Sequence, residues 1–143
     1  MAEYLMGIDA GTGSVRVALF DFRGQNRAYA VAEYGTTYPK NGWAEQSDYE
    51  WFEALKKAIP ECIKKAGIAA DNIAAITCDA TTNTLVYLDE NDTSVRPPIL
   101  WMDVRATEEA SFIDTIREEY DATKFYKPGF RAVSYTHLRA HET

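Results

Sequence analysis

The stretch Gly7-Ile8-Asp9-Ala10-Gly11-Thr12-Gly13-Ser14 decides how the rest of the chain is organised. A short apolar run at residues 4–8 leads into it, and apolar side chains recur at every second position of residues 15–21, as a β-strand requires. The glycines therefore lie in a hairpin turn between two strands. A dinucleotide fingerprint needs its glycines to open a helix, and a Walker loop needs a Gly-Lys-Ser/Thr ending, so this stretch is neither motif.

The small residues of this turn allow two interpretations. In the first, backbone N–H groups approach an anion such as a phosphate closely, and the hydroxyls of Thr12 and Ser14 assist them. Asp9, at the end of the first strand, would then face a metal ion bound to the phosphate. In the second, the turn is an ordinary glycine-rich hairpin in which Asp9 and Ser14 only satisfy backbone groups. The motif alone does not decide between them.

Length, composition and charge limit the class of protein. The 143 residues suffice for one domain with a core, and 46% hydrophobic with 26% charged residues are typical of a soluble globular protein. A net charge of -7 argues against a nucleic-acid or anionic-membrane surface, and we find neither a membrane span nor a signal peptide. Cys62 and Cys78 fit no zinc or disulfide pattern, so we expect two buried thiols in a cytoplasmic protein.

The rest of the chain alternates predicted strands and helices. We expect a third antiparallel strand at residues 26–34 and a helix from Ser47 to Gly67, which Pro60 should kink or divide. Residues 73–79 predict a buried parallel strand, residues 85–88 and 99–103 two more strands, and residues 105–120 a second helix. The predicted apolar stripe of the first helix is Trp51, Phe52, Leu55, Ile59, Cys62 and Ile63. This order predicts the α/β class, with a mixed sheet flanked by helices.

Three aspartates end predicted strands, namely Asp9, Asp79 and Asp103. Ligands of such sheets bind beyond the carboxyl ends of the strands, so the three carboxylates could converge on one edge. In the alternative, Asp79 and Asp103 each cap a turn or a helix. The acidic stretch at residues 89–94 is interpreted as a solvated turn rather than a metal site.

Four blocks, taken in order, resemble the start of an FGGY-family carbohydrate kinase. They are GIDAGTGSVRVALFD at residues 7–21, GWAEQ at 42–46, ITCDATTNTLVYLDE at 76–90 and RPPILWMDVRA at 96–106. Within the family, they are more similar to pentulose kinases of the ribulokinase and xylulokinase type than to glycerol kinase. The resemblance implies the actin/hexokinase-like ATPase fold, in which two ribonuclease-H-like domains close on ATP, Mg2+ and a sugar.

The resemblance also implies roles for individual residues. Asp9 would lie near the transferring phosphate and near Mg2+, which it would contact through water. The nucleotide's phosphates would be held by Gly11, Thr12, Gly13 and Ser14, with Arg16 beside them. Residues on the sugar side would be Asp79, Thr82, Asn83, Trp101 and Asp103. At Thr82 and Asn83 the family carries other residue types, Met-His or Arg-Glu. A structural role is implied for GWAEQ.

We therefore expect a carbohydrate kinase that transfers the γ-phosphate of ATP to a hydroxyl of a sugar, with a ketopentose as the best-matching substrate. The partner is a small-molecule sugar, with no nucleic acid and no membrane, and the resemblance is compatible with a homodimeric parent. The catalytic base and the adenosine site would lie downstream of this sequence, so the chain alone should be inactive. Two alternatives are a non-kinase ATPase, such as a chaperone or filament protein, and a non-catalytic sugar- or phosphate-binding domain.

The end of the chain breaks with the composition before it. Residues 133–143 contain both histidines, His137 and His141, and resemble the conceptual translation of a sequencing adapter. We expect residues 132–143 to be a non-native, poorly ordered tail. Residues 1–131 would then be the truncated N-terminal part of kinase domain I.

Overall fold

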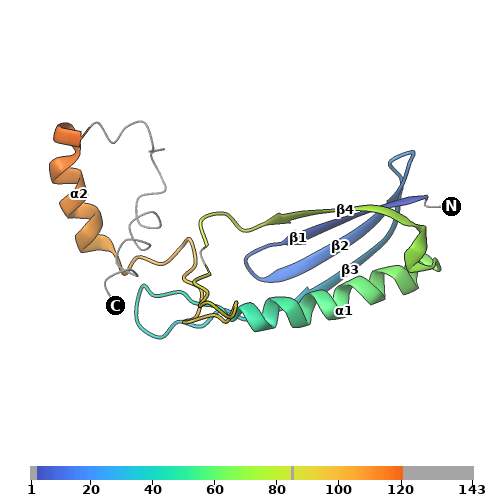
Figure 1. Cartoon of the computed structure of the whole chain (residues 1–143), viewed down its shortest axis with the longest axis horizontal. Helices are drawn as coiled ribbons and strands as arrows, with labels where there is room; N and C mark the ends of the chain where they lie inside the picture. The colour runs from blue at the N-terminus through green and yellow to red at the C-terminus, as the bar shows by residue number, and fades with distance from the viewer. Residues whose placement is uncertain (1–2, 85, 121–143) are drawn as a thin grey trace. The chain divides into compact units, whose positions relative to one another are not determined.

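The glycine-rich turn joins the first two strands of a four-stranded sheet. A computed structural model describes residues 3–84 and 86–120 and places β1 (Tyr4–Ala10), β2 (Ser14–Asp21), β3 (Asn26–Glu33) and β4 (Ile73–Ala80) in the order β3-β2-β1-β4 (Figure 1). β1 pairs antiparallel with β2, and β2 antiparallel with β3. β4 runs parallel to β1. The predicted three-strand meander and the parallel fourth strand are both confirmed.

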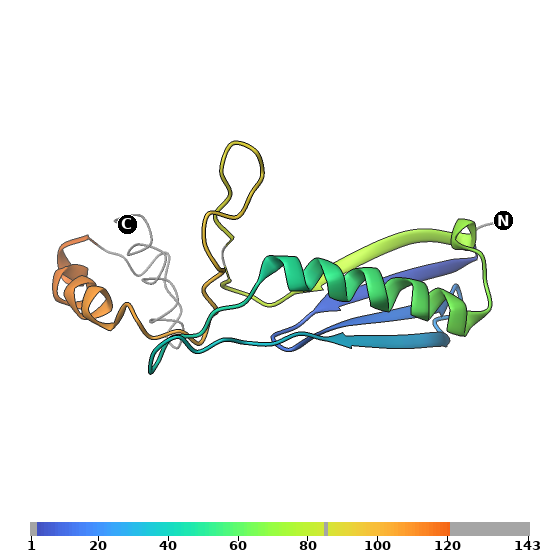
Figure 2. The ribbon, with the colours of Figure 1, turned by 90° about the horizontal axis from the view of Figure 1, so that it is seen from below.

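Helix α1 (Asp48–Ala66) covers one face of this sheet, as Figure 2 shows. The strands turn alternate side chains toward it, so that Met6 and Val17 are buried while their neighbours on the chain face the other way. The helix contributes small residues, Ala54, Ala58 and Cys62, to this core. Phe52, expected in the buried stripe, is 60% exposed instead, because the stripe is centred on these small residues.

Pro60 does not divide α1: a single helix runs through it from Asp48 to Ala66, so of the two expected outcomes, a kink or a division, the division is wrong. A proline inside a helix removes the N–H that would bond the carbonyl four residues earlier, here that of Lys56. Both Pro60 and Lys56 lie on the exposed side of the helix, where water can hydrate that carbonyl. The loss is therefore tolerated at this position.

β4 is not the buried strand that its apolar sequence predicts. It follows a 3-10 turn, η1 (Ala70–Asn72), and is exposed at every position after its first residue. The cause is its place at the edge of the sheet, because α1 packs against β2 and β3. Ile76 is 58% exposed, and Cys78 is an exposed thiol rather than a buried one. Cys62 is buried as expected.

The chain divides into two units. The sheet and α1 belong to the first, residues 1–35 and 48–81; the second comprises residues 36–47 and 82–143. In the second unit α2 spans Thr107–Tyr120, close to the expected helix. The strands expected at 85–88 and 99–103 are wrong where described: Leu88 and Ile99 form only isolated bridges, to Ser94 and Glu45. Leu85 and the expected tail at 132–143 lie outside the described residues.

Asp89 behaves as expected of a solvated turn. Its Oδ1 accepts hydrogen bonds from the N–H groups of Asn91 and Thr93, at 2.8 and 2.9 Å. These bonds lower the pKa of the Asp89 carboxyl, the bond from Thr93 most. Among residues 3–84 and 86–120, no helix combines the length and the apolar character needed to cross a membrane.

Candidate active site

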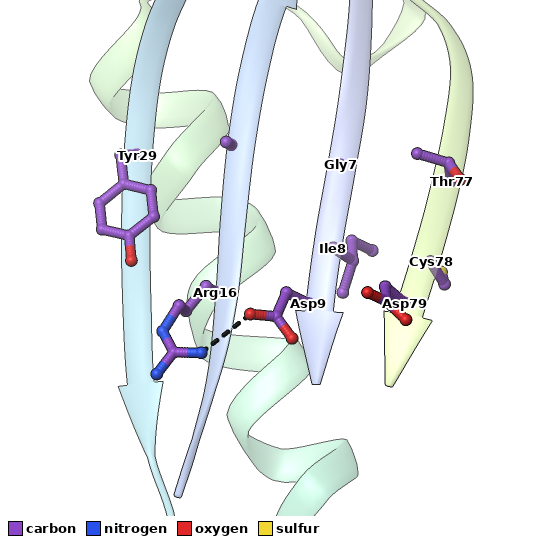
Figure 3. Close-up of a pocket in the computed structure, with 9 residues that line it drawn as sticks. Gly7, Ile8, Asp9, Arg16, Tyr29, Thr77, Cys78 and Asp79 are labelled. Atoms are coloured by element: carbon purple, nitrogen blue, oxygen red, sulfur yellow. Dashed lines mark hydrogen bonds and ion pairs between the residues drawn. The ribbon is translucent and has the colours of Figure 1, made fainter. Parts of the chain in front are cut away.

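Two of the three strand-terminal aspartates lie side by side. In the parallel pair of β1 and β4, Asp9 is in register with Asp79 and Gly7 with Thr77. Residues in register on neighbouring strands project from the same face of a sheet. This is the face opposite α1, because Met6 and Ile8 alternate with these positions and are buried against the helix. The carboxyl ends of β1 and β4 therefore present two neighbouring carboxylates (Figure 3).

A pocket of about 340 Å³ opens on the same face. Its lining comes from all four strands: Gly7, Ile8, Asp9, Arg16, Ala18, Tyr29, Thr77, Cys78 and Asp79. Gly7 helps to make the space, because a Cβ atom added there would meet no atom within 4 Å. Sequence reasoning did not select Tyr29, which stands on β3 beside Arg16 in Figure 3. The alternation of side chains along β3 could have indicated Tyr29, since it places Tyr29 on the same face of the sheet as Arg16.

Asp9 and Arg16 form an ion pair across β1 and β2. Arg16 Nη1 donates to Asp9 Oδ2 at 2.8 Å. The hydrogen bond to Asp9 is the main reason that the pKa of Arg16 is raised, so the guanidinium stays charged. Both side chains are nearly half exposed, and exposed ion pairs contribute little to stability because water and salt screen them. A phosphate can therefore replace Asp9 as the partner of Arg16 at little cost, and a metal ion can replace Arg16 as the partner of Asp9.

The hairpin is closed by a bond from Gly11 N–H to the Ser14 carbonyl, at 3.0 Å. A Cβ atom on Gly11 would lie 2.9 Å from Arg16 Nη1, so a side chain there would displace the guanidinium. Gly13 is exposed at the tip, whereas Ser14 is 6% exposed and its hydroxyl lies largely beneath the surface. The turn thus offers backbone more than hydroxyl groups to a ligand.

The carboxylates at the ends of β1 and β4 fit a Mg2+ ion that also binds substrate phosphates and water. Mg2+ is commonly held by one or two carboxylates together with substrate phosphates and water. Asp9 and Asp79 supply two carboxylates, while the described residues include no group of three or more His, Cys, Asp or Glu side chains able to hold a metal. The two carboxylates are the kind of ligand that Mg2+ takes from a protein when phosphates and water complete its coordination.

In the second unit, the GWAEQ segment pairs with the segment that carries Trp101 and Asp103. Gln46 N–H donates to the Pro98 carbonyl at 3.2 Å, and Leu100 N–H donates to the Ala44 carbonyl at 3.0 Å. Asp103 is completely buried, and its Oδ2 accepts the Ala44 N–H at 2.6 Å. Trp101 remains 42% exposed. The pairing gives the GWAEQ motif the structural role that was expected of it.

Arg105, which sequence reasoning did not select, joins these two segments. Its Nε and Nη2 donate to the two oxygens of Asp103 at 2.8 and 2.6 Å, and Nη2 lies 2.7 Å from Glu45 Oε1. The guanidinium also stacks over the Trp43 ring, 3.8 Å from its centre. Burial lowers the pKa of Arg105, but the bonds to Asp103 and Glu45 outweigh it and the net shift is upward. The Asp-x-Arg spacing was the only signal of this cluster in the sequence.

The expected site residues are thus divided between the two units. Asp9, the hairpin, Arg16 and Asp79 come together in the first. Thr82, Asn83, Trp101 and Asp103 belong to the second. Thr82 and Asn83 form a turn, in which Asn83 adopts a φ of 55°, a left-handed conformation that Asn tolerates better than most residues. Whether these residues contact a sugar stays a prediction.

Residues 4–138 match the N-terminal domain of the FGGY family of carbohydrate kinases. The chain belongs to this family. A glycerol kinase from Rhizobium meliloti is 32% identical over 120 residues, which cover 83% of this chain and 24% of the relative. A xylulose kinase from Staphylococcus epidermidis is 32% identical over 144 residues, covering 98% and 28% respectively. The chain thus spans about a quarter of the length of the relatives it matches.

Solved structures of FGGY kinases confirm the fold. A crystal structure described as a xyloylose kinase from Brucella ovis superposes with a TM-score of 0.76 and 29% sequence identity, over 80% of this chain and 24% of that one. The expected α/β architecture of the actin/hexokinase-like ATPase class is therefore confirmed. The family is one of phosphotransferases that act on carbohydrates, as the four sequence blocks implied.

Proposed function

We propose that this chain is the N-terminal part of an ATP-dependent carbohydrate kinase, in which it forms one side of the phosphate site and part of the sugar site. The observation on which this rests is the grouping of Asp9, Arg16 and Asp79 beside the glycine hairpin, at the carboxyl ends of two parallel strands. The kinase would act in the cytoplasm. The 143 residues alone would give no turnover, because the catalytic base and the adenosine site are expected downstream.

On the phosphate side, residues 11–14 would bind the β- and γ-phosphates of ATP through backbone N–H groups, with the Arg16 guanidinium beside them. Asp9 would orient the water ligands of Mg2+. Asp79, expected from the family resemblance on the sugar side, lies in register with Asp9 and would assist it. Mg2+, when bound with ATP, neutralises charge on the phosphates during transfer. The Asp9–Arg16 ion pair would hold the two side chains beside the hairpin until the ligand separates them.

On the sugar side, we propose a ketopentose as substrate, contacted by Thr82, Asn83 and the exposed ring of Trp101. A relative named xylulose kinase supports this choice. Asp103 would act through Trp101 rather than touch the sugar, since its carboxylate is fully buried in bonds to Ala44 and Arg105. A polyol is the second candidate, because a relative named glycerol kinase is equally similar.

The test uses the complete kinase that carries this sequence. ADP formation should appear with ATP, Mg2+ and one of a panel of ketopentoses and polyols. Asp9→Asn should lower kcat by about 10- to 100-fold, the range seen when an outer-sphere carboxylate of a metal site is removed. Asp71→Asn, which changes an exposed aspartate in η1, is the matched control and should leave kcat unchanged. An enzyme that is folded and phosphorylates none of the panel contradicts the proposal.

A further inference from the structure

Tyr34, the residue directly after β3, contacts the glycine hairpin twice. Its hydroxyl donates a hydrogen bond to the Gly11 carbonyl, 23 positions away in the sequence. Its backbone N–H donates to the Gly13 carbonyl at 3.2 Å. One residue therefore binds the carbonyl oxygens of both glycines of the turn.

The directions of these two carbonyls also fix the directions of the N–H groups in the same peptide planes. In a trans peptide, the carbonyl and the following N–H point in opposite directions. The Gly11 carbonyl shares its peptide plane with the N–H of Thr12, and the Gly13 carbonyl with that of Ser14. Because Tyr34 draws both carbonyls toward itself, the N–H groups of Thr12 and Ser14 are aimed away from Tyr34.

This orientation matters for an anion. Carbonyl oxygens repel a phosphate, and N–H groups attract it, so a glycine turn that rotated its peptide planes would lose its affinity. Glycine allows such rotation more than any other residue. The Tyr34 ring packs partly against the core beneath the sheet, which gives the contact a fixed anchor. Burial, and next the charge of Asp9, raise the pKa of the phenol, so the hydroxyl stays a neutral donor near neutral pH.

We propose that Tyr34 is a positioning residue of the phosphate site: its hydroxyl holds the hairpin with the Thr12 and Ser14 N–H groups directed at the polyphosphate, which Tyr34 itself does not touch. This inference rests on the proposed function, in which the hairpin binds the phosphates of ATP. It differs from a purely structural role because it predicts a defect confined to the phosphate part of the ligand.

The test compares Tyr34→Phe with Tyr49→Phe in the complete kinase. Tyr49 is 68% exposed on α1, so its variant removes the same hydroxyl from a surface site. Tyr34→Phe should raise the KM for ATP and the Kd for inorganic tripolyphosphate about three- to tenfold, the effect of one lost hydrogen bond. The Kd for adenosine and the KM for the sugar should stay at wild-type values, as should every constant of Tyr49→Phe.

Two results separate the possible failures. If the wild-type enzyme binds tripolyphosphate and folded Tyr34→Phe binds it equally well, the inference is overturned while the proposed function stands. If the wild-type enzyme binds neither ATP nor tripolyphosphate, both are overturned. Should Tyr34→Phe fail to fold, hydrogen exchange in the wild-type enzyme decides: tripolyphosphate should slow the exchange of the Thr12 and Ser14 amides. If tripolyphosphate binds and leaves this exchange unchanged, the two amides do not face the phosphate and the inference is overturned.

Discussion

Replacing Asp103 with alanine tests whether this carboxylate anchors the second unit or binds substrate. Asp103 is 0% exposed and accepts hydrogen bonds from Ala44 N–H and from three donors of Arg105, its N–H, Nε and Nη2. The Arg105 side chain is itself only 4% exposed. The substitution would leave a buried guanidinium without its bidentate partner and the Ala44 N–H without its acceptor.

Breaking a buried ion pair by removing one partner costs about 3–5 kcal/mol, and we expect Asp103→Ala to fall in this range. Asp103→Asn should cost less, because one oxygen remains to accept a hydrogen bond. The change can be measured on the chain itself by urea unfolding. Fluorescence reports on the second unit through Trp43 and Trp101, and on the first through Trp51 of α1.

Glu90→Ala, a change at an exposed acidic residue of the same unit, is the control and should leave the unfolding midpoint unchanged. The reasoning is refuted if Asp103→Ala unfolds at the wild-type urea concentration. If the complete kinase carrying this stable variant also loses affinity for its sugar, Asp103 is a substrate ligand, as the family resemblance first implied.

Two further predictions concern titratable groups of the first unit. Cys78 is exposed, whereas Cys62 is buried and its thiol pKa is raised by that burial. A thiol reagent should therefore modify Cys78 in the native chain and Cys62 only after unfolding. Equal rates of modification of the two thiols in the native chain would contradict the structure. The pKa of Tyr34 is raised above its ordinary value of 10.0, so the folded state holds that proton more tightly than the unfolded state does. Its contribution to stability should be complete below about pH 10 and be lost as the pH rises through the folded pKa, whereas Tyr34→Phe should lack this part of the pH dependence.

The strands of the first sheet could be predicted because the signals that define them lie within short stretches of sequence. Two-residue alternation and a glycine turn define the hairpin, and an apolar run after a helix defines β4 as parallel. The burial of β4 could not be predicted in this way, because it depends on what covers the strand. The strands expected at residues 85–88 and 99–103 are wrong for a related reason. Residues of high β-propensity form a strand only where a neighbouring strand pairs with them, and Leu88 and Ile99 each form a single isolated bridge.

The candidate site was predictable in its types of residue and not in its contacts. Asp9, Arg16 and Asp79 could be selected because they end or begin strands in recognisable motifs. The contact of Tyr34 with Gly11 spans 23 positions, and no periodicity in the sequence connects them. Asp103 presents the same strand-terminal pattern as Asp79, yet one carboxylate is fully buried and the other exposed. What distinguishes the two is their tertiary surroundings: the Ala44 N–H, 59 positions away, covers Asp103, whereas Asp79 lies on the exposed edge strand β4.

The most direct test of the phosphate site is a crystal structure of the complete kinase with Mg2+ and a non-hydrolysable ATP analogue. We predict oxygens of the β- and γ-phosphates at hydrogen-bond distance, about 2.7–3.2 Å, from backbone nitrogens of residues 11–14. Arg16 should have turned from Asp9 toward the phosphates, and Asp9 should face the metal's water ligands. Phosphates bound elsewhere in the enzyme, with the Asp9–Arg16 pair intact and the hairpin empty, would contradict the account.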